Sequence, residues 1–203
     1  MKHEIILIGG GGHCKSCIDV IEQEKSFRIA GIIDVREKLN HMLLGYKVIG
    51  SDKDLQEIVK HYDKFLITVG QIKSPSIRIR LFNYMKKLHA TLPTVISPLG
   101  YVSSHAHLGE GTIIMHGAVV NAGAIIGANC IINSKALIEH DAHIGDHCHI
   151  ATGALINGGV QIDDETFVGS GSVCNEAIKI GKRVIISSGT KVKEDIPAKK
   201  VVS

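Results

Sequence analysis

The sequence contains no Trp, and only 4% of its residues are aromatic. With so few large rings, any core must be built mainly from Ile, Val, Leu and Ala. Long apolar runs are also missing. Residues 5–8 are too short an apolar run for a signal peptide, and no stretch approaches the length of a membrane span. We therefore expect a cytoplasmic protein with no membrane partner, whose five cysteines are reduced.

An excess of one charge is lacking as well. The 23 Lys and Arg residues are dispersed and nearly balanced by 20 Asp and Glu residues, which gives a net charge of +3. Without a basic stripe, nucleic acid is not an expected partner. A mildly positive protein can still favour phosphorylated small molecules. The hydrophobic content of 44% predicts a folded chain of one large domain or two small ones.

An aliphatic residue recurs at every sixth position from residue 102 onward. Sixteen positions follow this spacing without an insertion, and only Cys174 departs from Ile, Leu and Val. The series is Val102, Leu108, Ile114, Val120, Ile126, Ile132, Ile138, Ile144, Ile150, Ile156, Ile162, Val168, Cys174, Ile180, Ile186 and Val192. Four residues after each lies a mostly small residue. A period of six is neither helical nor simple strand alternation. It predicts short strands and turns stacked into a parallel β-helix.

The first part of the chain has a different pattern. Strands are expected at residues 5–8, 29–34 and 65–69, and helices at 15–24, 52–61 and 76–88, with 91–96 leading into the repeats. Strands that alternate with helices predict a small, Rossmann-like α/β domain with a parallel sheet. We therefore expect two domains, at residues 1–95 and 96–203.

A glycine run lies between the first expected strand and helix. There, backbone N–H groups and the helix dipole can hold a phosphate. The dinucleotide fingerprint is incomplete, because Gly9 and Gly11 fit it but Cys14 occupies the third position. This favours a mononucleotide-linked ligand over NAD. The alternative is that the glycines only make a tight strand-to-helix turn.

One histidine of the repeat region has neighbours that suit a catalytic site. If one coil takes eighteen residues, His140 lies between Ala122 and Gly158, and Asp141 has a glycine on either side. These small neighbours leave room for a substrate. Histidine suits a general base near neutral pH, and Glu139 or Asp141 could orient its ring.

Four of the other histidines of the repeats are expected in solvent, and the roles of the remaining two are left open. Those expected in solvent are His105, His107, His116 and His147. His143 and His149 share one repeat position, and both can face solvent. No two of these histidines are eighteen residues apart, so none stack directly, and a zinc site between subunits is the less favoured alternative.

The cysteines are expected to pack rather than react. Cys14 and Cys17 have redox spacing, but they follow the glycine turn of a chain expected in a reducing compartment. Cys130 and Cys148 are eighteen residues apart, so we expect them to stack in the column of small residues.

The order of these parts resembles a known family. A small α/β domain precedes hexapeptide repeats, and the chain carries Gly11-Gly12-His13 and Ile138-Glu139-His140. Together they resemble the hexapeptide acyltransferases of the bacillosamine type, which acetylate nucleotide sugars. Lys15-Ser16 with Ile18-Asp19 resembles the related sialic acid O-acetyltransferases. The resemblance implies a left-handed β-helix, a homotrimer with active sites between subunits, acetyl-CoA as co-substrate and no metal.

The resemblance also implies roles for individual residues. His140 would be the general base, assisted by Glu139 and Asp141. The nucleotide-sugar site would comprise Gly9, Gly10, Gly11, Gly12, His13, Asp34, Gly70 and Asn133. Contacts to coenzyme A would come from His149, near the thioester carbonyl, and from Gly158, Ser170, Ser188 and Gly189.

The expected activity is N-acetylation of a nucleotide-linked 4-amino-4,6-dideoxy sugar for surface glycan synthesis. The alternatives are a sialic acid O-acetyltransferase, a zinc hydratase and a prism that binds without catalysis. Family members often end in a Gly-x-Pro-Ala-Lys segment that helps to cover coenzyme A. Residues 196–199 resemble part of an earlier coil exit instead, which leaves two alternatives open: such a tail is missing, or the given sequence is cut.

Overall fold

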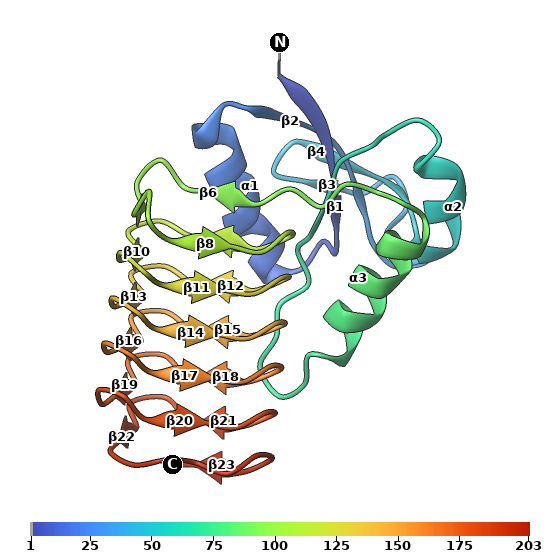
Figure 1. Cartoon of the computed structure of the whole chain (residues 1–203). Helices are drawn as coiled ribbons and strands as arrows, with labels where there is room; N and C mark the ends of the chain where they lie inside the picture. Colours follow the sequence, from blue (N-terminus) through green and yellow to red (C-terminus); the bar gives the residue numbers. More distant parts are fainter. Residues whose placement is uncertain (1) are drawn as a thin grey trace.

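The computed structural model describes residues 2–203, and an α/β part lies at one end of a triangular prism (Figure 1). The α/β part has one sheet of order β3-β4-β2-β1-β5, parallel except for the β3–β4 pair. Its strands are β1 (His3–Ile8), β2 (Phe27–Ile33), β3 (Met42–Leu43), β4 (Tyr46–Gly50) and β5 (Phe65–Ile67). Its helices are α1 (Gly12–Glu24), α2 (Leu55–Ile58) and α3 (Ser76–Lys87), with 3₁₀ turns at Arg36–Lys38 and Asp52–Asp54.

Most of the expected elements of this part are present with shifted ends. The helix expected over residues 52–61 is wrong in extent, because a 3₁₀ turn precedes an α-helix of four residues. The β3–β4 hairpin was not predicted. Leu44 and Gly45 connect its strands with φ values of 48° and 85°, and this left-handed backbone explains the glycine.

The prism is a left-handed parallel β-helix with three faces. The docked face lies toward the α/β part and contains β6 (Val95–Ile96), β9 (Ile113–Ile114), β12 (Ile131–Ile132), β15 (His149–Ile150), β18 (Phe167–Val168), β21 (Ile185–Ile186) and β23 (Val201–Val202). The apolar face contains β7 (Tyr101–Val102), β10 (Val119–Val120), β13 (Leu137–Ile138), β16 (Leu155–Ile156), β19 (Val173–Cys174) and β22 (Lys191–Val192). The polar face contains β8 (His107–Leu108), β11 (Ile125–Ile126), β14 (His143–Ile144), β17 (Gln161–Ile162) and β20 (Lys179–Ile180).

The six-residue repeat forms the core of the prism. Paired strands match residues eighteen apart, as Ile132 matches Ile150, so equivalent residues stack in columns. The aliphatic column from Ile114 onward is buried, and Cys174 fills its place with no exposed surface. Cys148 lies on Cys130, whose Sγ accepts a hydrogen bond from the Cys148 amide at 3.4 Å. All five cysteines are free and buried, which confirms that they pack.

Neighbouring residues of one strand test how much this core contributes. In β11, Ile126 points inward and is 2% exposed, whereas Ile125 points outward and is 41% exposed. We expect Ile126→Ala to lower the free energy of unfolding by about 2–5 kcal/mol, because it leaves a cavity in a packed interior. Ile125→Ala is the matched control and should cost less than about 1 kcal/mol. Urea unfolding at one protein concentration measures both, and equal losses would contradict the inward and outward assignment.

The α/β part covers the upper end of the docked face. Helix α1 packs Ile18 and Ile21 in one cluster with Ile113 and Ile131, the outward residues of two docked strands. Further along the same outward column the residues become His149, Phe167 and Ile185. The column thus changes from aliphatic to histidine below the strands that share this cluster with α1. Within residues 2–203, no helix has the length and apolar character of a membrane span.

Candidate functional site

His140 lies on the corner between the apolar and polar faces, which we call the histidine corner. Its side chain is 67% exposed, and its Nδ1 is 2.9 Å from Oδ2 of Asp141. Because the carboxylate accepts a hydrogen bond, Nδ1 carries the proton and the Nε2 lone pair is free. This hydrogen bond raises the pKa of His140 above its usual value, and it outweighs the opposing effect of desolvation. The pair therefore has the arrangement of a general base and its orienting acid.

Glycines make the space around this pair. A Cβ added to Gly158 would lie 2.8 Å from both Cε1 and Nε2 of His140, so the imidazole lies directly over the glycine. A Cβ on Gly123 would lie 2.5 Å from Oδ1 of Asp141. The Gly159 amide donates to the His140 carbonyl at 3.0 Å, which confirms the stacking expected from the eighteen-residue coil. The room predicted beside the histidine is thus partly filled by its own ring.

Glu139 is held by the coil above rather than by the ring. Its Oε2 accepts a hydrogen bond from Nδ2 of Asn121 at 2.8 Å and lies 3.4 Å from the amide of His140. Of the two carboxylates that could orient the imidazole, Asp141 is the one hydrogen-bonded to it. Glu139 adds negative charge that also raises the pKa of His140.

The predicted nucleotide-sugar residues of the α/β part gather at the carboxyl ends of β1, β2 and β5. Gly9 has φ +109°, and a Cβ there would lie 2.5 Å from Cγ2 of Val69. A Cβ on Gly10 would lie 2.6 Å from Oδ2 of Asp34, and one on Gly70 would lie 3.5 Å from Cβ of His13. In open parallel sheets, ligands bind at this edge, next to the strand where the order reverses.

The start of α1 lies at this edge of the sheet, which we call the glycine edge. Neither Gly11 nor Gly12 has any atom within 4 Å of an added Cβ, and no side chain caps the helix. The first N–H groups of α1 are therefore available to an anion. Asp34 is bound to Nζ of Lys38 at 2.7 Å. Burial lowers the pKa of His13 to about 3, with Arg78 adding to the effect, so His13 is neutral at physiological pH.

His149 is buried, so the expectation that it can face solvent is wrong. Its Nδ1 donates to the carbonyl of Gln71 at 2.5 Å, and its Nε2 accepts from Nδ2 of Asn133 at 3.1 Å. Its ring also meets Phe167 edge-on, with centroids 5.2 Å apart. Burial lowers the pKa of His149 to about 4, so the ring is neutral and both nitrogens are occupied. The loop that covers it is 78 residues away in the sequence.

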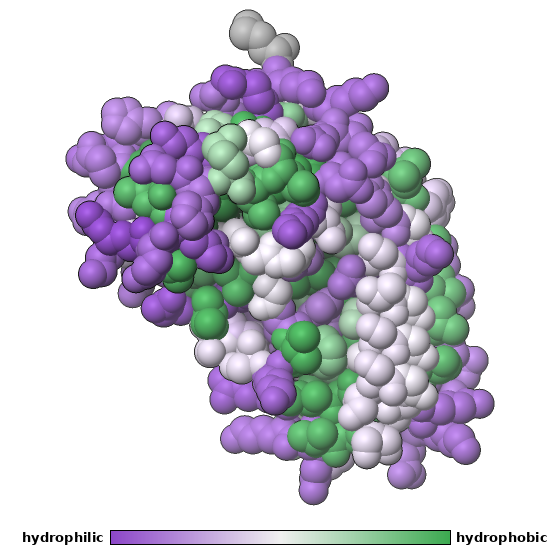
Figure 2. Space-filling model, turned by 180° about the vertical axis from the view of Figure 1, so that it is seen from behind, coloured by the Kyte–Doolittle hydropathy of each residue, from purple (hydrophilic) through white to green (hydrophobic). Residues whose placement is uncertain are grey.

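The predicted coenzyme contacts lie on two corners. Ser170, Ser188 and Gly189 lie between the docked and apolar faces, on the corner we call the small-residue corner. An added Cβ on Gly171 or Gly189 would meet no atom within 4 Å. Such Gly and Ser positions have intermediate hydropathy, and a pale column of this kind runs down the prism in Figure 2. Gly158 lies apart, on the histidine corner.

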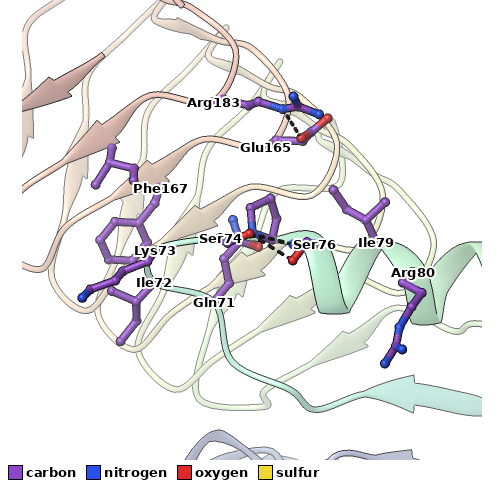
Figure 3. Close-up of a pocket in the computed structure, with 12 residues that line it drawn as sticks. Gln71, Ile72, Lys73, Ser74, Ser76, Ile79, Arg80, Glu165, Phe167 and Arg183 are labelled. Carbon is purple, nitrogen blue, oxygen red and sulfur yellow. Dashed lines mark hydrogen bonds and ion pairs between the residues drawn. The ribbon is translucent and has the colours of Figure 1, made fainter. Parts of the chain in front are cut away.

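A cavity of about 520 Å³ lies beside His149, between residues 71–80 and the docked face (Figure 3). Gln71 and Phe167, which both contact His149, line it together with Ile72 and Ile185. Charged side chains at its edge include Arg183, which is paired with Glu165 at 2.5 Å. None of the predicted site residues lines this cavity.

Two histidines expected in solvent have defined partners instead. His116 binds Oγ of Ser97 at 2.6 Å and Oδ2 of Asp19 at 2.9 Å, which joins the first coils to α1. His147 is partly buried, accepts from Nδ2 of Asn129 at 3.0 Å, and has a lowered pKa because of burial. Among residues 2–203, no three His, Cys, Asp or Glu side chains are grouped to hold a metal ion.

The chain matches two protein families in the order of its two parts. Residues 4–85 match the PglD N-terminal domain, and residues 105–140 match the bacterial transferase hexapeptide family. No match is found among the curated proteins.

Solved structures match almost the whole chain. A His→Asn variant of perosamine N-acetyltransferase from Caulobacter crescentus, in complex with CoA and GDP-perosamine, is 28% identical, with TM-score 0.92 over 98% of this chain and 92% of that one. The acetyltransferase domain of PglB from Neisseria gonorrhoeae, in complex with acetyl coenzyme A, is 26% identical, with TM-score 0.90 over 99% and 96%. WeeI from Acinetobacter baumannii shares the fold at 24% identity, with TM-score 0.86 over 100% and 97%.

The chain is a hexapeptide-repeat acetyltransferase. Its resemblance to the sugar N-acetyltransferases of this family is confirmed, as are the fold class and acetyl-CoA as co-substrate. For this acetyltransferase, sequence reasoning missed two buried polar residues next to the site. These are Gln71, which shields His149, and Arg78, which holds the segment that carries Gln71.

Proposed function

We propose that this acetyltransferase transfers an acetyl group from acetyl-CoA to the 4-amino group of a nucleotide-linked 4,6-dideoxy sugar, with His140 as general base. The observation that carries the proposal is the His140–Asp141 pair, whose free Nε2 lies on an exposed corner of the prism. The likeness to an enzyme in complex with CoA and GDP-perosamine supports the choice of an amino-sugar acceptor.

The proposed mechanism is a direct attack. The sugar amine, in its neutral form, attacks the thioester carbon while Nε2 of His140 takes a proton from the nitrogen. The tetrahedral intermediate collapses to the amide and expels the thiolate of coenzyme A, which takes the proton back from the imidazolium. Asp141 stabilises that imidazolium and holds Nδ1 protonated, so that Nε2 is the basic atom throughout.

The nucleotide is proposed to bind at the carboxyl edge of the α/β sheet. Its diphosphate would meet the uncapped start of α1, where Gly11 and Gly12 leave the backbone accessible. Asp34 follows β2, as do the acidic residues that bind ribose hydroxyls in related sheets. Coenzyme A is proposed to follow the small-residue corner past Ser170 and Ser188.

A homotrimer would complete this site. His140 lies on the histidine corner, whereas His149 and the predicted coenzyme contacts Ser170 and Ser188 flank the other edge of the apolar face. A neighbouring subunit can bring the two edges together. The outward residues of the apolar face support such contacts, because they are mainly Tyr101, Val119, Leu137, Leu155 and Val173.

We therefore expect Leu155→Glu to dissociate the assembly, since it places a charge on the apolar face. Light scattering coupled to size exclusion should then report a mass near 21.8 kDa instead of three times this value. Gln161→Glu, on the polar face of the same coil, is the matched control and should leave the trimer intact. A trimeric Leu155→Glu protein would exclude this face as the interface.

The experiment that tests the proposed function is release of free thiol from acetyl-CoA with a panel of acceptors. The panel compares GDP- and UDP-linked 4-amino-4,6-dideoxy sugars with free and CMP-linked sialic acids. Turnover with an amino sugar alone supports the proposal. Turnover with sialic acid alone would replace it with O-acetylation, and no turnover with either would leave the zinc hydratase and binding-prism alternatives, which metal analysis and ligand binding separate. Location in the cytoplasm and a part in surface glycan synthesis stay predictions from the sequence.

A further inference from the structure

Arg78 is a cation buried without a carboxylate. It is 1% exposed, and burial lowers its pKa to about 10, so it remains charged at neutral pH. Its Nη1 donates to the carbonyls of Ile67 and Val69 at 2.8 and 2.7 Å, and its Nη2 donates to the carbonyl and Oδ1 of Asn129 at 3.1 and 2.7 Å. Its Nε has no hydrogen-bond partner within residues 2–203. Packing alone would be served as well by an apolar side chain, because burying a charge is costly.

The guanidinium joins two parts of the molecule that the proposed reaction needs in register. Nη1 holds the end of β5, at the glycine edge of the sheet. Nη2 holds Asn129 on the third corner of the prism, between the polar and docked faces. Asn129 is itself fixed by His147, whose ring meets Phe82 of α3 edge-on at 5.2 Å.

Residues 69–71, which follow Thr68 after the end of β5, contact two parts of the site. Val69 packs against Gly9, and Gly70 lies next to His13, so both belong to the glycine edge. Gln71 accepts the Nδ1 proton of His149 on its carbonyl and donates from Nε2 to the carbonyl of His147 at 3.0 Å. A shift of residues 69–71 would therefore change both the glycine edge and the hydrogen bond that the His149 ring donates to Gln71.

We infer that Arg78 is a positioning residue that fixes residues 69–71 and thereby couples the glycine edge, where the nucleotide is proposed to bind, to His149. Its hydrogen bonds go to Ile67, Val69 and Asn129, so it acts on the proposed site through the backbone. Its fork of donors satisfies the two carbonyls at the end of β5 and two acceptors on the prism at once, which a single ammonium cannot do. The contacts of residues 69–71 are sufficient for the coupling between the glycine edge and His149. The link to substrate affinity rests on the proposed function.

The test compares Arg78→Met with Arg80→Met. Methionine keeps the apolar stem of Arg78, and Arg80 is an exposed residue of the same helix whose side chain binds Asp52 at 3.2 Å. Nitrogen NMR of the His149 ring reports its tautomer without any substrate. We expect the wild type and Arg80→Met to show a single Nδ1-protonated neutral ring, and Arg78→Met to show a mixture of tautomers. An unchanged ring in Arg78→Met would overturn the coupling.

Ligand binding gives the second readout. Titration calorimetry with GDP and UDP measures the affinity for each nucleotide. For the nucleotide that the wild type binds, Arg78→Met should lower the affinity by about three- to thirty-fold, the usual range for residues that act on a site without touching its ligand. If Arg78→Met binds the nucleotide as tightly as Arg80→Met does, the inference is overturned. If the wild type neither binds nor acetylates nucleotide sugars, the proposed function is overturned, and the NMR signal of the His149 ring then tests the inference.

A second variant covers the case in which Arg78→Met fails to fold. Asn129 has φ +53°, a conformation that glycine adopts without strain, so Asn129→Gly removes the side-chain acceptor of Nη2 and keeps the backbone one. We expect a smaller change of the His149 ring in the same direction. Asn129→Gly with a wild-type ring would contradict the inference.

Discussion

Replacing His140 by alanine should lower kcat by about 10²–10⁴, the usual contribution of a general base. The variant removes the only side chain on the histidine corner that combines a free imidazole nitrogen with a bound carboxylate among residues 2–203. Because His140 is exposed and packs no core, urea unfolding and the proposed trimer should be unchanged. Steady-state thiol release from acetyl-CoA with saturating amino sugar measures the loss. A loss below tenfold in a folded protein would remove His140 from the role of base.

The pH profile separates the base from a residue that merely binds. Asp141 raises the pKa of His140, and the imidazole acts as a base only when it is unprotonated. Activity of the wild type should therefore fall as pH drops through that raised pKa. In Asp141→Asn the pKa returns toward its usual value, so the acid limb should move to lower pH while the maximal rate falls. An acid limb that stays in place would show that another group controls it.

Replacing Gly158 by alanine should lower kcat by about 10², with little change in stability. The new Cβ would lie 2.8 Å from two ring atoms of His140, closer than real carbon contacts come, so the ring must move. That ring is exposed and can turn aside, which spares the fold. Displacement of a catalytic group by about 1 Å can cost 10²-fold in rate. Thiol release and thermal unfolding, measured on the same preparation, test both halves of this expectation.

The control for Gly158→Ala is the same change in the His140→Ala background. If the alanine acts only by moving the imidazole, the double variant should be no slower than His140→Ala alone. Additive losses would show that Gly158 acts by another route, such as the coenzyme contact that the family resemblance implies.

The prism could be predicted from the sequence because its period is local. Every coil repeats the same order of aliphatic and small residues, so the columns that contain Ile132 and Cys148 can be read without knowledge of distant contacts. The edge hairpin β3–β4 could not be predicted in this way. Its strands are short, and only Gly45, in a left-handed conformation, marks the turn.

The candidate site likewise contains residues that the local repeat predicts and residues that depend on distant contacts. The neighbours of His140 follow from counting eighteen residues in either direction, and the structure has them where the count puts them. The setting of His149 does not follow from counting, because its cover is the carbonyl of Gln71 in another part of the chain. Arg78 gave no signal either, since it binds mainly backbone carbonyls, which every residue possesses.

Because the coils stack without interruption, equivalent positions along the prism axis are separated by whole multiples of the rise of one coil. Neighbouring strands of a sheet are about 4.7–4.9 Å apart, and each coil adds one strand to every face. Loss or gain of a whole coil between residues 113 and 149 would move His149 by one such step relative to α1, whereas a change of any other length would rotate it off the docked face. The separation between the proposed nucleotide-sugar and coenzyme sites can therefore change during evolution only by whole coils.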